Sequence, residues 1–360
     1  MPPVKKILID LEKLKNRYVG LGEVSARFAK ALQPHAKRLR EEGIELYLLV
    51  PSSYKQHFGD DLHYITANFL NKKFPRLLPE VDLWHAIHQT SSYTPAYSRT
   101  KYLLTIHDLN FVHEKKGRKV DKYKNGIQRK INRATAISTI SDFTRAEVLQ
   151  YLTVPDPSIH TIRNGVANPL EIAPSIPPGF HPDETFLFHL SAISVKKNTH
   201  TLVDLMKTLP EKKLVIAGSW QTRYAKRILA RIREEKITNI IPVNQPDDAE
   251  KAWLYQHCEA FLFPSLFEGF GLPVIEAMYC GKPVFVSRHS SLPEIGGDKV
   301  YYWDHFDPLH MREIVLKGLD EYNRQPGRAA ELKDYAATFS WEETILRYID
   351  LYRQVLSRPI

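Results

Sequence analysis

The sequence is poor in cysteine, with only Cys258 and Cys280 in 360 residues. They do not form a C-x-x-C pair, so we expect neither a disulfide framework nor a zinc site, and both are predicted to be buried thiols. No apolar run approaches the roughly 20 residues that a membrane-spanning helix needs. The N-terminus also lacks the basic, apolar and small-residue pattern of a secretion signal. These absences predict a cytoplasmic protein.

Charge is distributed unevenly along the chain. Residues 1–170 contain 27 Lys plus Arg against 16 Asp plus Glu, whereas the remainder contains 23 against 25, so the net +9 is +11 in front and −2 behind. A basic N-terminal half of this kind either binds an anionic partner or keeps the protein in solution by self-repulsion. The densest basic stretch, from Lys115 to Arg133, comes with no nucleic-acid motif or aromatic platform. We expect no nucleic-acid partner, and an anionic membrane or a phosphorylated acceptor stays open.

Short apolar runs alternate with amphipathic stretches of helical length, which predicts βαβ units and parallel sheets. In the first half, one helix is expected over 24–39, and strands are expected at 7–10, 46–50, 82–85, 102–106 and 136–140. In the second half, strands are expected at 186–190, 213–217, 239–243, 260–264, 283–287 and 299–302. Each half is predicted to form a doubly wound, Rossmann-like α/β domain.

Residues 169–182 contain five prolines and no helical or strand period, which predicts an extended linker between the two domains. The predicted N-terminal domain is therefore 1–168, and the C-terminal domain is 183–340. Residues 341–360 are expected to form a closing helix that packs back on the N-terminal domain. Its apolar positions recur at helical spacing, at Ile345, Ile349, Tyr352 and Leu356.

The segment 261–284 carries the clearest chemical signal, because it reads as strand, glycine-rich turn, helix and next strand. The helix is expected over 272–280, since Pro273 suits its first turn and Gly281 suits its C-terminal cap. Gly269 and Gly271 let the main chain approach a ligand closely. The N–H groups at the helix N-terminus attract an anion such as a diphosphate.

Two glutamates bracket this turn: Glu268 precedes it and Glu276 lies one turn into the helix. Carboxylates repel phosphate but accept hydrogen bonds from hydroxyl groups. Ligands of open α/β sheets bind at the carboxyl edge of the strands. We therefore predict a phosphate bracketed by two sugars, with one carboxylate for each sugar. The alternative is an ordinary capped helix whose acidic residues favour its N-terminus.

The run Glu268-Gly-Phe-Gly-Leu-Pro-Val-Ile-Glu276 resembles the Glu-x7-Glu signature of retaining glycosyltransferases of the GT-B fold, specifically glycosyltransferase family 4. The resemblance covers nearly the whole chain, through Val19-Gly-Leu-Gly-Glu, Leu103-Leu-Thr-Ile-His-Asp-Leu, Ser138-Thr-Ile-Ser-Asp-Phe-Thr, Ile162-Arg-Asn-Gly-Val, Val195-Lys-Lys-Asn and Phe339-Ser-Trp. It implies two facing Rossmann-like domains with a cleft between them. The N-terminal domain would bind the acceptor and the C-terminal domain the nucleotide-sugar donor.

The resemblance also implies roles at the donor site. Glu268 would contact hydroxyls of the transferred sugar, and Glu276 would hold the ribose hydroxyls of the nucleotide. Main-chain groups of the turn would approach the sugar and the phosphate, at Gly269, Phe270, Gly271 and Leu272.

Lys197 would neutralise the diphosphate as the nucleotide leaves. The family usually has an arginine five residues before this lysine, and the residue here is Ala192. Lys196, Arg288 or a cation of the N-terminal domain would then have to compensate, or catalysis would be weakened.

His107 ends the strand 102–106, and the family places this histidine beside the donor sugar. It would position the sugar or support charge rather than act as a general base; a structural hydrogen-bonding role is the alternative. Gly20 and Gly22 lie in an expected loop that resembles the family loop reaching the donor phosphate, and a plain turn is the alternative. The neighbouring Asn16 and Arg17 are candidates for contact with the acceptor.

His85 and His88 are spaced like metal ligands, but no nearby carboxylate or cysteine set completes a site. We expect no essential metal and no cofactor besides the nucleoside-diphosphate sugar, which is a co-substrate.

Together with these features, the resemblance implies a retaining, metal-independent glycosyltransferase that moves a hexose-like sugar, of mannose or glucose type, to a glycan or lipid-linked acceptor. The expected setting is bacterial surface polysaccharide or lipopolysaccharide synthesis at the inner face of the plasma membrane. The alternatives are a non-catalytic GT-B module at a membrane surface, which Ala192 would favour, a nucleotide-sugar epimerase and a phosphorylase. A dinucleotide-dependent oxidoreductase is disfavoured because no Gly-x-Gly-x-x-Gly turn follows a strand.

Overall fold

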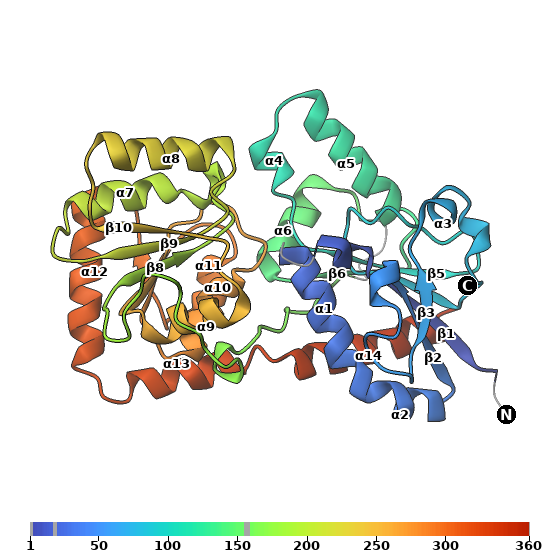
Figure 1. Ribbon diagram of the computed structural model, residues 1–360. Helices are drawn as coiled ribbons and strands as arrows, with labels where there is room; N and C mark the ends of the chain where they lie inside the picture. The colour runs from blue at the N-terminus through green and yellow to red at the C-terminus, as the bar shows by residue number, and fades with distance from the viewer. Residues whose placement is uncertain (1–2, 17–19, 155–158, 360) are drawn as a thin grey trace. The chain divides into compact units, whose positions relative to one another are not determined.

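The computed structural model of the chain describes residues 3–16, 20–154 and 159–359. The chain divides into two compact units, which Figure 1 colours along the sequence. Unit 1 consists of Met1–Gly165 together with Ser340–Ile360, and unit 2 consists of Val166–Phe339. The chain therefore leaves unit 1 once and returns to it for its last helix.

Unit 1 contains a seven-stranded sheet in the order β3-β2-β1-β4-β5-β6-β7, with every neighbouring pair parallel. The order reverses between β1 and β4, which is the kind of switch point where open α/β sheets bind ligands. The strands are β1 (Lys5–Asp10), β2 (Ile44–Val50), β3 (His63–Thr66), β4 (Leu83–Ala86), β5 (Lys101–Ile106), β6 (Ala136–Thr139) and β7 (Ile159–Thr161).

Helices cover both faces of this sheet. Neighbouring residues of β1 pack into opposite cores, because side chains alternate between the faces of a strand. Ile7 and Ile9 pack with α1 (Gly20–Leu32), α2 (Ala36–Glu41) and α14 (Trp341–Ser357). Leu8 packs with α4 (Phe111–Glu114), α5 (Arg118–Ile131) and α6 (Asp142–Tyr151).

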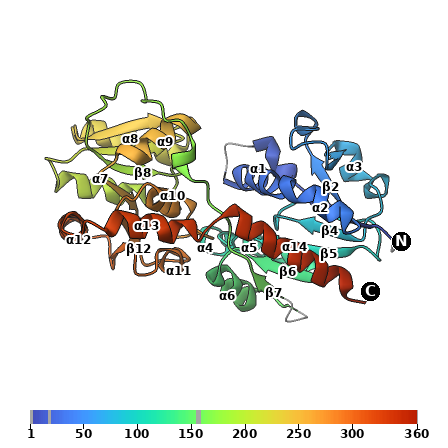
Figure 2. The same ribbon diagram turned by 90° about the horizontal axis from the view of Figure 1, so that it is seen from below.

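The closing helix α14 contacts α1, β4 and β5, and Figure 2 shows it running across the sheet of unit 1. Its tyrosines enter a buried polar network with the sheet. His85 of β4 lies 2.8 Å from the Tyr352 hydroxyl and 2.8 Å from the Thr105 hydroxyl. The Tyr348 hydroxyl lies 3.2 Å from Thr105 and 3.3 Å from Ser138. The network joins α14 to three neighbouring strands.

Unit 2 contains a six-stranded parallel sheet in the order β10-β9-β8-β11-β12-β13, which reverses between β8 and β11. Its strands are β8 (Leu187–Leu190), β9 (Leu214–Gly218), β10 (Ile240–Asn244), β11 (Ala260–Phe263), β12 (Val284–Ser287) and β13 (Tyr301–Trp303). The predicted pair of parallel α/β sheets is thus confirmed.

The helices of unit 2 also lie on both faces of its sheet. One face packs against α7 (Thr199–Lys207), α8 (Arg223–Glu234) and α12 (Pro308–Asn323). The other meets α9 (Asp248–His257) and α10 (Leu272–Tyr279), and α13 (Arg328–Ala337) packs on α10. The remaining short helices are η1 (Glu12–Asn16), η2 (Gln33–His35), η3 (Ser52–Tyr54), α3 (Phe69–Lys73), η4 (Pro75–Leu77), η5 (Pro169–Glu171), η6 (Val195–Lys197) and α11 (Leu292–Gly296).

Three expectations about elements differ from the structure. The helix expected over 24–39 is divided into α1, η2 and α2, because Pro34 cannot donate the hydrogen bond that an α-helix interior needs. The edge strands β3 and β7 were not expected, since they are short and only partly apolar. The segment 169–182, which was expected to be an extended linker between the domains, belongs to unit 2 and packs on it.

Several contacts hold that segment. The side chain of Gln256 donates to the Pro169 carbonyl at 3.3 Å, and the Ser175 N–H donates to the Ala249 carbonyl at 3.1 Å. The Phe180 ring packs edge-on against Trp253. Among the helices that the structure describes, none is both long and apolar enough to cross a membrane.

Candidate functional site

The glycine-rich motif lies at the carboxyl end of β11, where the chain turns into α10. The helix expected over 272–280 is found over Leu272–Tyr279. Gly271 caps its N-terminus with φ of 113°, and a Cβ added there would lie 2.9 Å from Cδ2 of Leu292. Gly281 follows the helix with φ of 69°. The motif therefore needs glycine at both of these positions.

Two serines outside the motif fasten the loop before α10. The N–H of Glu268 donates to Ser290 Oγ at 2.9 Å. Ser291 Oγ donates to the carbonyl oxygens of Glu268 at 3.1 Å and Phe270 at 2.8 Å. The Phe270 side chain is buried and packs edge-on against Phe339, so only its main chain is suited to meet a ligand. Sequence reasoning missed both serines, which follow the neighbouring strand β12.

Lys197 and Glu268 meet across the switch point of unit 2. Lys197 ends η6, which follows β8, and Glu268 follows β11. The Lys197 ammonium forms an ion pair with Glu268 Oε1 and lies 5.3 Å from the centre of the Phe263 ring. Both side chains are largely buried, with 13% and 12% of their surface exposed. The structure thus brings together the lysine and the first glutamate that the sequence predicted for the donor.

Glu276 has a partner that the sequence did not reveal. The hydroxyl of Tyr255, on α9, donates to Glu276 Oε2 at 2.7 Å. Burial holds the pKa of Tyr255 well above its ordinary value of 10.0, so the hydroxyl keeps its proton and acts as a donor. Tyr255 therefore orients the second carboxylate of the motif.

Ala192 is exposed after β8, at the position of the missing arginine. Arg288, one of the expected substitutes, is engaged elsewhere: it pairs with Asp304, and its guanidinium lies 4.4 Å from the centre of the Tyr302 ring. Lys196 lies beside the motif, because its carbonyl accepts the Leu266 N–H at 2.8 Å. The Lys197 ammonium contacts the motif directly through its ion pair with Glu268.

His107 lies buried at the end of β5 in unit 1. Its Nε2 contacts the Ile87 carbonyl at 2.7 Å, and a carbonyl only accepts, so Nε2 carries the proton. Gln89 accepts the His107 N–H at 3.0 Å. Burial lowers the pKa of His107 from 6.5, so the ring is neutral near pH 7 and Nδ1 is its acceptor nitrogen. A neutral ring of this kind can orient a hydroxyl group.

Gly20 and Gly22 do not lie in a loop, which corrects the sequence-based expectation. Both belong to the first turn of α1, and Gly22 is buried. The first turn of a helix leaves its N–H groups without intrahelical acceptors, so they can still meet an anion. Of the neighbouring candidates, Asn16 ends η1, whereas Arg17 and Val19 lie outside the described residues.

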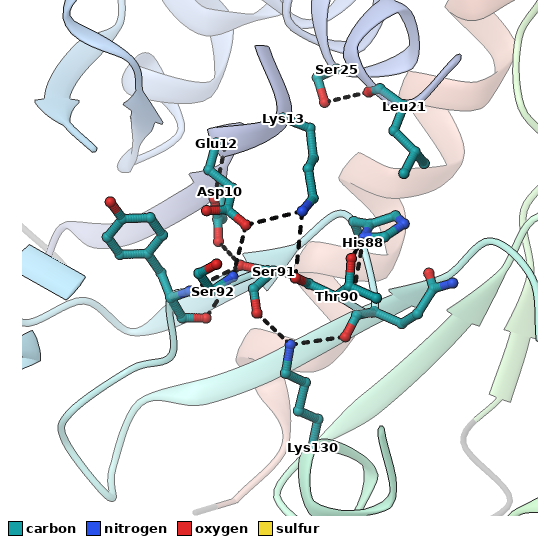
Figure 3. Close-up of polar contacts among 12 residues, drawn as sticks. Asp10, Glu12, Lys13, Leu21, Ser25, His88, Thr90, Ser91, Ser92 and Lys130 are labelled. Carbon is teal, nitrogen blue, oxygen red and sulfur yellow. Dashed lines mark hydrogen bonds and ion pairs between the residues drawn. The ribbon is translucent and has the colours of Figure 1, made fainter. Parts of the chain in front are cut away.

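A second polar cluster lies at the switch point of unit 1, between β1 and the loop after β4 (Figure 3). Asp10 ends β1; its Oδ1 accepts the Glu12 N–H at 3.0 Å, and its Oδ2 accepts the Ser91 hydroxyl. Burial raises the pKa of Asp10 from 3.8 to about 7. Glu12 accepts the Ser92 N–H at 2.7 Å and pairs with Lys13 at 3.3 Å.

Lys130 enters this cluster from α5, as Figure 3 shows. Its ammonium donates to the carbonyls of Gln89 at 2.8 Å and Ser91 at 2.6 Å, and burial lowers its pKa. His88 Nδ1 accepts the N–H and the hydroxyl of Thr90 at 3.0 and 2.8 Å. Acceptors and donors thus alternate over a short distance, which suits a hydroxyl-rich ligand.

The two histidines that are spaced like metal ligands have different hydrogen-bond partners in the structure. His85 faces Tyr352 and Thr105, whereas His88 bonds to Thr90. In the part of the chain that the structure describes, no three or more His, Cys, Asp and Glu side chains are placed to hold a metal ion.

Two family models match the chain, one for each half. The model described as Glycosyltransferase Family 4 matches residues 32–167, and the model described as Glycosyl transferases group 1 matches residues 176–329. Two known Escherichia coli proteins are similar to the chain. The O-antigen chain mannosyltransferase B is 24% identical over 387 residues, which cover 97% of this chain and 99% of that protein.

The serotype-specific mannosyltransferase WbdA is 28% identical over 239 residues, which cover 62% of this chain and 29% of WbdA.

Two solved structures share the fold over nearly the whole chain. Sucrose-phosphate synthase from Thermosynechococcus elongatus has a TM-score of 0.74 at 17% identity, covering 98% of this chain and 99% of that one. Anabaena HepE in complex with UDP-glucose has a TM-score of 0.75 at 16% identity, covering 97% and 99%.

Proposed function

The chain belongs to the GT-B glycosyltransferases of the family 4 type, and on that basis we propose that it transfers a hexose-like sugar with retention of configuration. The donor would be a nucleoside-diphosphate sugar, and the acceptor a glycan or a lipid-linked glycan. The observation that carries this proposal is the ion pair of Lys197 with Glu268 across the switch point of unit 2. Glu276, held by Tyr255, completes the predicted donor set.

The donor would bind by exchanging partners at this ion pair. A diphosphate carries more negative charge than one carboxylate, so it would compete with Glu268 for the Lys197 ammonium. Glu268 could then accept a hydrogen bond from a sugar hydroxyl, and Glu276 could accept from the ribose hydroxyls. The N–H groups and dipole of α10 would meet the diphosphate. These groups would supply the charge stabilisation without a metal ion, and we propose a metal-independent reaction.

Retention would follow from attack on the face that the diphosphate leaves. The acceptor oxygen would form its bond to the anomeric carbon while the bond from that carbon to the phosphate oxygen breaks. The acceptor proton would pass to the departing diphosphate. His107, whose neutral ring presents Nδ1 as an acceptor, would position the sugar rather than take that proton.

The relatives suggest the biological setting. Two of them are named as mannosyltransferases, one of the O-antigen chain. We propose that this chain handles a donor of mannose or glucose type in bacterial surface polysaccharide synthesis, at the cytoplasmic face of the membrane.

The acceptor site is proposed at the polar cluster of unit 1. Asp10, Glu12 and Lys130 lie where ligands of open α/β sheets bind. Glu12→Gln should raise KM for the acceptor several-fold and leave donor affinity unchanged. An unchanged acceptor KM would place the acceptor elsewhere.

The basic stretch supports the proposed membrane location. Seven of its cations are exposed on or beside α5, namely Lys116, Arg118, Lys119, Lys122, Lys124, Arg129 and Arg133. Such a surface should attract anionic lipid and release it as salt screens the charges. Sedimentation with anionic and neutral vesicles at increasing salt tests this, and equal binding to both lipids would contradict it.

A panel of nucleotide sugars tests the proposed function. The expected result is nucleotide release with one donor, transfer to an added glycan acceptor and the same anomeric configuration in donor and product by proton NMR. An epimerase would instead change the sugar without an acceptor, and a non-catalytic module would release nothing from any donor. Activity that disappears with a chelator and returns with a divalent ion would contradict metal independence.

A further inference from the structure

The segment from Phe69 to Leu77 exposes four large apolar side chains. It comprises α3 and η4, which follow the edge strand β3. The exposed fractions are 72% for Phe69, 57% for Leu70, 51% for Phe74 and 62% for Leu77. The other exposed large apolar residues that the structure describes are scattered singly along the chain. Single exposures are ordinary, but a contiguous group marks an interaction surface. We call these four residues the α3–η4 patch.

Cations accompany the patch, and acidic residues do not. Lys72, Lys73 and Arg76 lie in the same segment, and residues 69–78 contain no Asp or Glu. The Lys73 ammonium lies 6.0 Å from the centre of the Phe69 ring and 5.5 Å from that of Phe74. Apolar side chains with cations beside them match the boundary of a bilayer, where acyl chains and headgroups meet.

The patch adjoins the end of the basic stretch that runs from Lys115 to Arg133. The Arg133 guanidinium donates to the Tyr97 carbonyl at 3.2 Å. The Tyr97 hydroxyl donates to the Arg76 carbonyl at 3.5 Å. One tyrosine thus touches both segments. Unit 1 as a whole contains 30 Lys plus Arg against 19 Asp plus Glu, a net charge of +11. Its charge is therefore complementary to an anionic surface.

We propose that the α3–η4 patch inserts its apolar side chains into the headgroup region of an anionic bilayer, beside the electrostatic contact of α5. The proposal rests on the membrane location proposed above, and it adds an apolar anchor. A second copy of this chain fits less well, because the patch is a segment of nine residues and stable protein interfaces use about 20–30 residues a side.

The two kinds of contact should act together. Stable attachment to a bilayer generally takes two signals, such as an apolar insertion and a polybasic surface. Salt weakens the electrostatic part and leaves the apolar part nearly unchanged. Removing two large apolar side chains should lower the partition into vesicles by about tenfold or more.

The experiment uses the full chain and vesicles of phosphatidylcholine, with or without phosphatidylglycerol. Phe69→Ser/Leu70→Ser and Leu77→Ser should each bind anionic vesicles more weakly than the wild type. Leu309→Ser is the matched control, since Leu309 is 66% exposed in unit 2. It should bind like the wild type. The replaced side chains are exposed, and an unchanged melting temperature will show that the variants fold.

A fluorescent probe reports insertion directly. Cys258 and Cys280 are buried, so a thiol-reactive dye can be placed on Leu77→Cys or on Leu309→Cys. Emission from position 77 should rise and shift to the blue with anionic vesicles, and emission from position 309 should not. The proposal is overturned if the patch variants bind vesicles as strongly as the wild type and the emission from position 77 does not change. A protein would then be the partner of the patch.

The test of membrane insertion can be separated from the test of sugar transfer. Transfer to a soluble acceptor without vesicles should be equal in all patch variants and in the wild type. A protein that binds vesicles through the patch but transfers no sugar would contradict the proposed function alone. A protein that transfers sugar but leaves the patch in water would contradict the membrane anchor alone.

Discussion

At the scale of single residues, the proposed donor site depends on how two carboxylates are held. Glu268 is paired with Lys197, and Glu276 accepts from Tyr255. The two glutamates therefore differ in their partners although they share one short motif. This difference makes their proposed roles separable by substitution.

Glu268→Gln should lower turnover by about a hundredfold, because loss of the charge misplaces the sugar in the transition state. Affinity for the free nucleoside diphosphate should stay the same or rise, since Lys197 no longer has to break its ion pair with the Glu268 carboxylate before it binds the diphosphate. Single-turnover kinetics and calorimetry measure the two effects. Glu313→Gln, on an exposed position of α12, is the control. Full activity of Glu268→Gln, or an inverted product, would overturn the retaining assignment.

Tyr255→Phe should weaken nucleotide binding by roughly tenfold, because the Glu276 carboxylate loses a hydrogen bond that orients it. The matched control is Tyr224→Phe, which removes a tyrosine hydroxyl bonded to His200 in the same unit. Glu276→Ala should cost at least as much affinity. If calorimetry gives equal affinities for Tyr255→Phe and the wild type, Tyr255 does not position Glu276 for the nucleotide.

Asp10→Asn should change how stability depends on pH. Asp10 has a pKa of about 7 in the folded state against 3.8 ordinarily, so its contribution to stability is lost as pH rises from about 4 to 7. His85 acts in the opposite sense, because its folded pKa is about 3 against 6.5, so stability is lost as pH falls from about 6.5 to 3. The two contributions oppose each other between about pH 4.5 and 6.

Removal of the Asp10 titration should therefore leave stability rising with pH more steeply than in the wild type, by about 1.4 kcal/mol per pH unit. Urea unfolding at several pH values measures the slope. Asp121→Asn, an exposed aspartate of α5, should leave it unchanged. If the plots of stability against pH are parallel for Asp10→Asn and the wild type, Asp10 is ionised in the folded protein throughout this pH range.

At the scale of elements, the turn between β11 and α10 combines a special backbone conformation with close packing. Gly271 has φ of 113°, and a Cβ there would lie 2.9 Å from Cδ2 of Leu292 of α11, which would have to shift. Ser290 and Ser291 hold the same turn by hydrogen bonds. The loop that would meet the donor is therefore held both by packing against Leu292 and by hydrogen bonds to Ser290 and Ser291.

Gly271→Ala should destabilise unit 2 by about 1–3 kcal/mol and weaken donor binding, because both the backbone and Leu292 must shift. Gly179→Ala separates the two causes, since Gly179 also has positive φ, +85°, but nothing lies within 4 Å of its added Cβ. Gly327→Ala, with neither constraint, should be nearly neutral. Urea unfolding compares the three. Equal stability of Gly271→Ala and Gly327→Ala would contradict the account of the turn.

At the scale of the whole molecule, the chain builds two sheets and then returns to the first. Residues 340–360 belong to unit 1, where α14 supplies much of one core and caps the His85 network. The C-terminal end of the chain therefore stabilises the unit proposed to bind the acceptor.

Ile349→Ala should lower the stability of unit 1 by about 2–5 kcal/mol, because Ile349 is fully buried in the core beneath α14. Calorimetry should show an earlier transition for unit 1, and a nucleoside diphosphate should raise only the transition of unit 2. Leu356→Ala, at the partly buried end of the same helix, should have a smaller effect. A single transition that shifts as a whole would show that the units unfold together.

The sequence by itself determined the features that depend on neighbouring residues. The alternation of strands and helices, Gly271, Pro273 and the end of α10 all follow from local backbone preferences, and the structure confirms them. Gly20 and Gly22 were expected in a loop that resembles the family loop at the donor phosphate, yet α1 begins at Gly20 and includes both, because the first turn of a helix tolerates glycine.

Only the tertiary structure decided which distant residues meet. Lys197 reaches Glu268 because β8 and β11 are neighbours at the switch point, and Asp10 reaches Ser91 because β1 lies beside β4. Tyr255 reaches Glu276 through the packing of α9 on α10. The order of strands in a sheet is set by burial of apolar surface across the whole unit. No local pattern around any one of these residues contains that information.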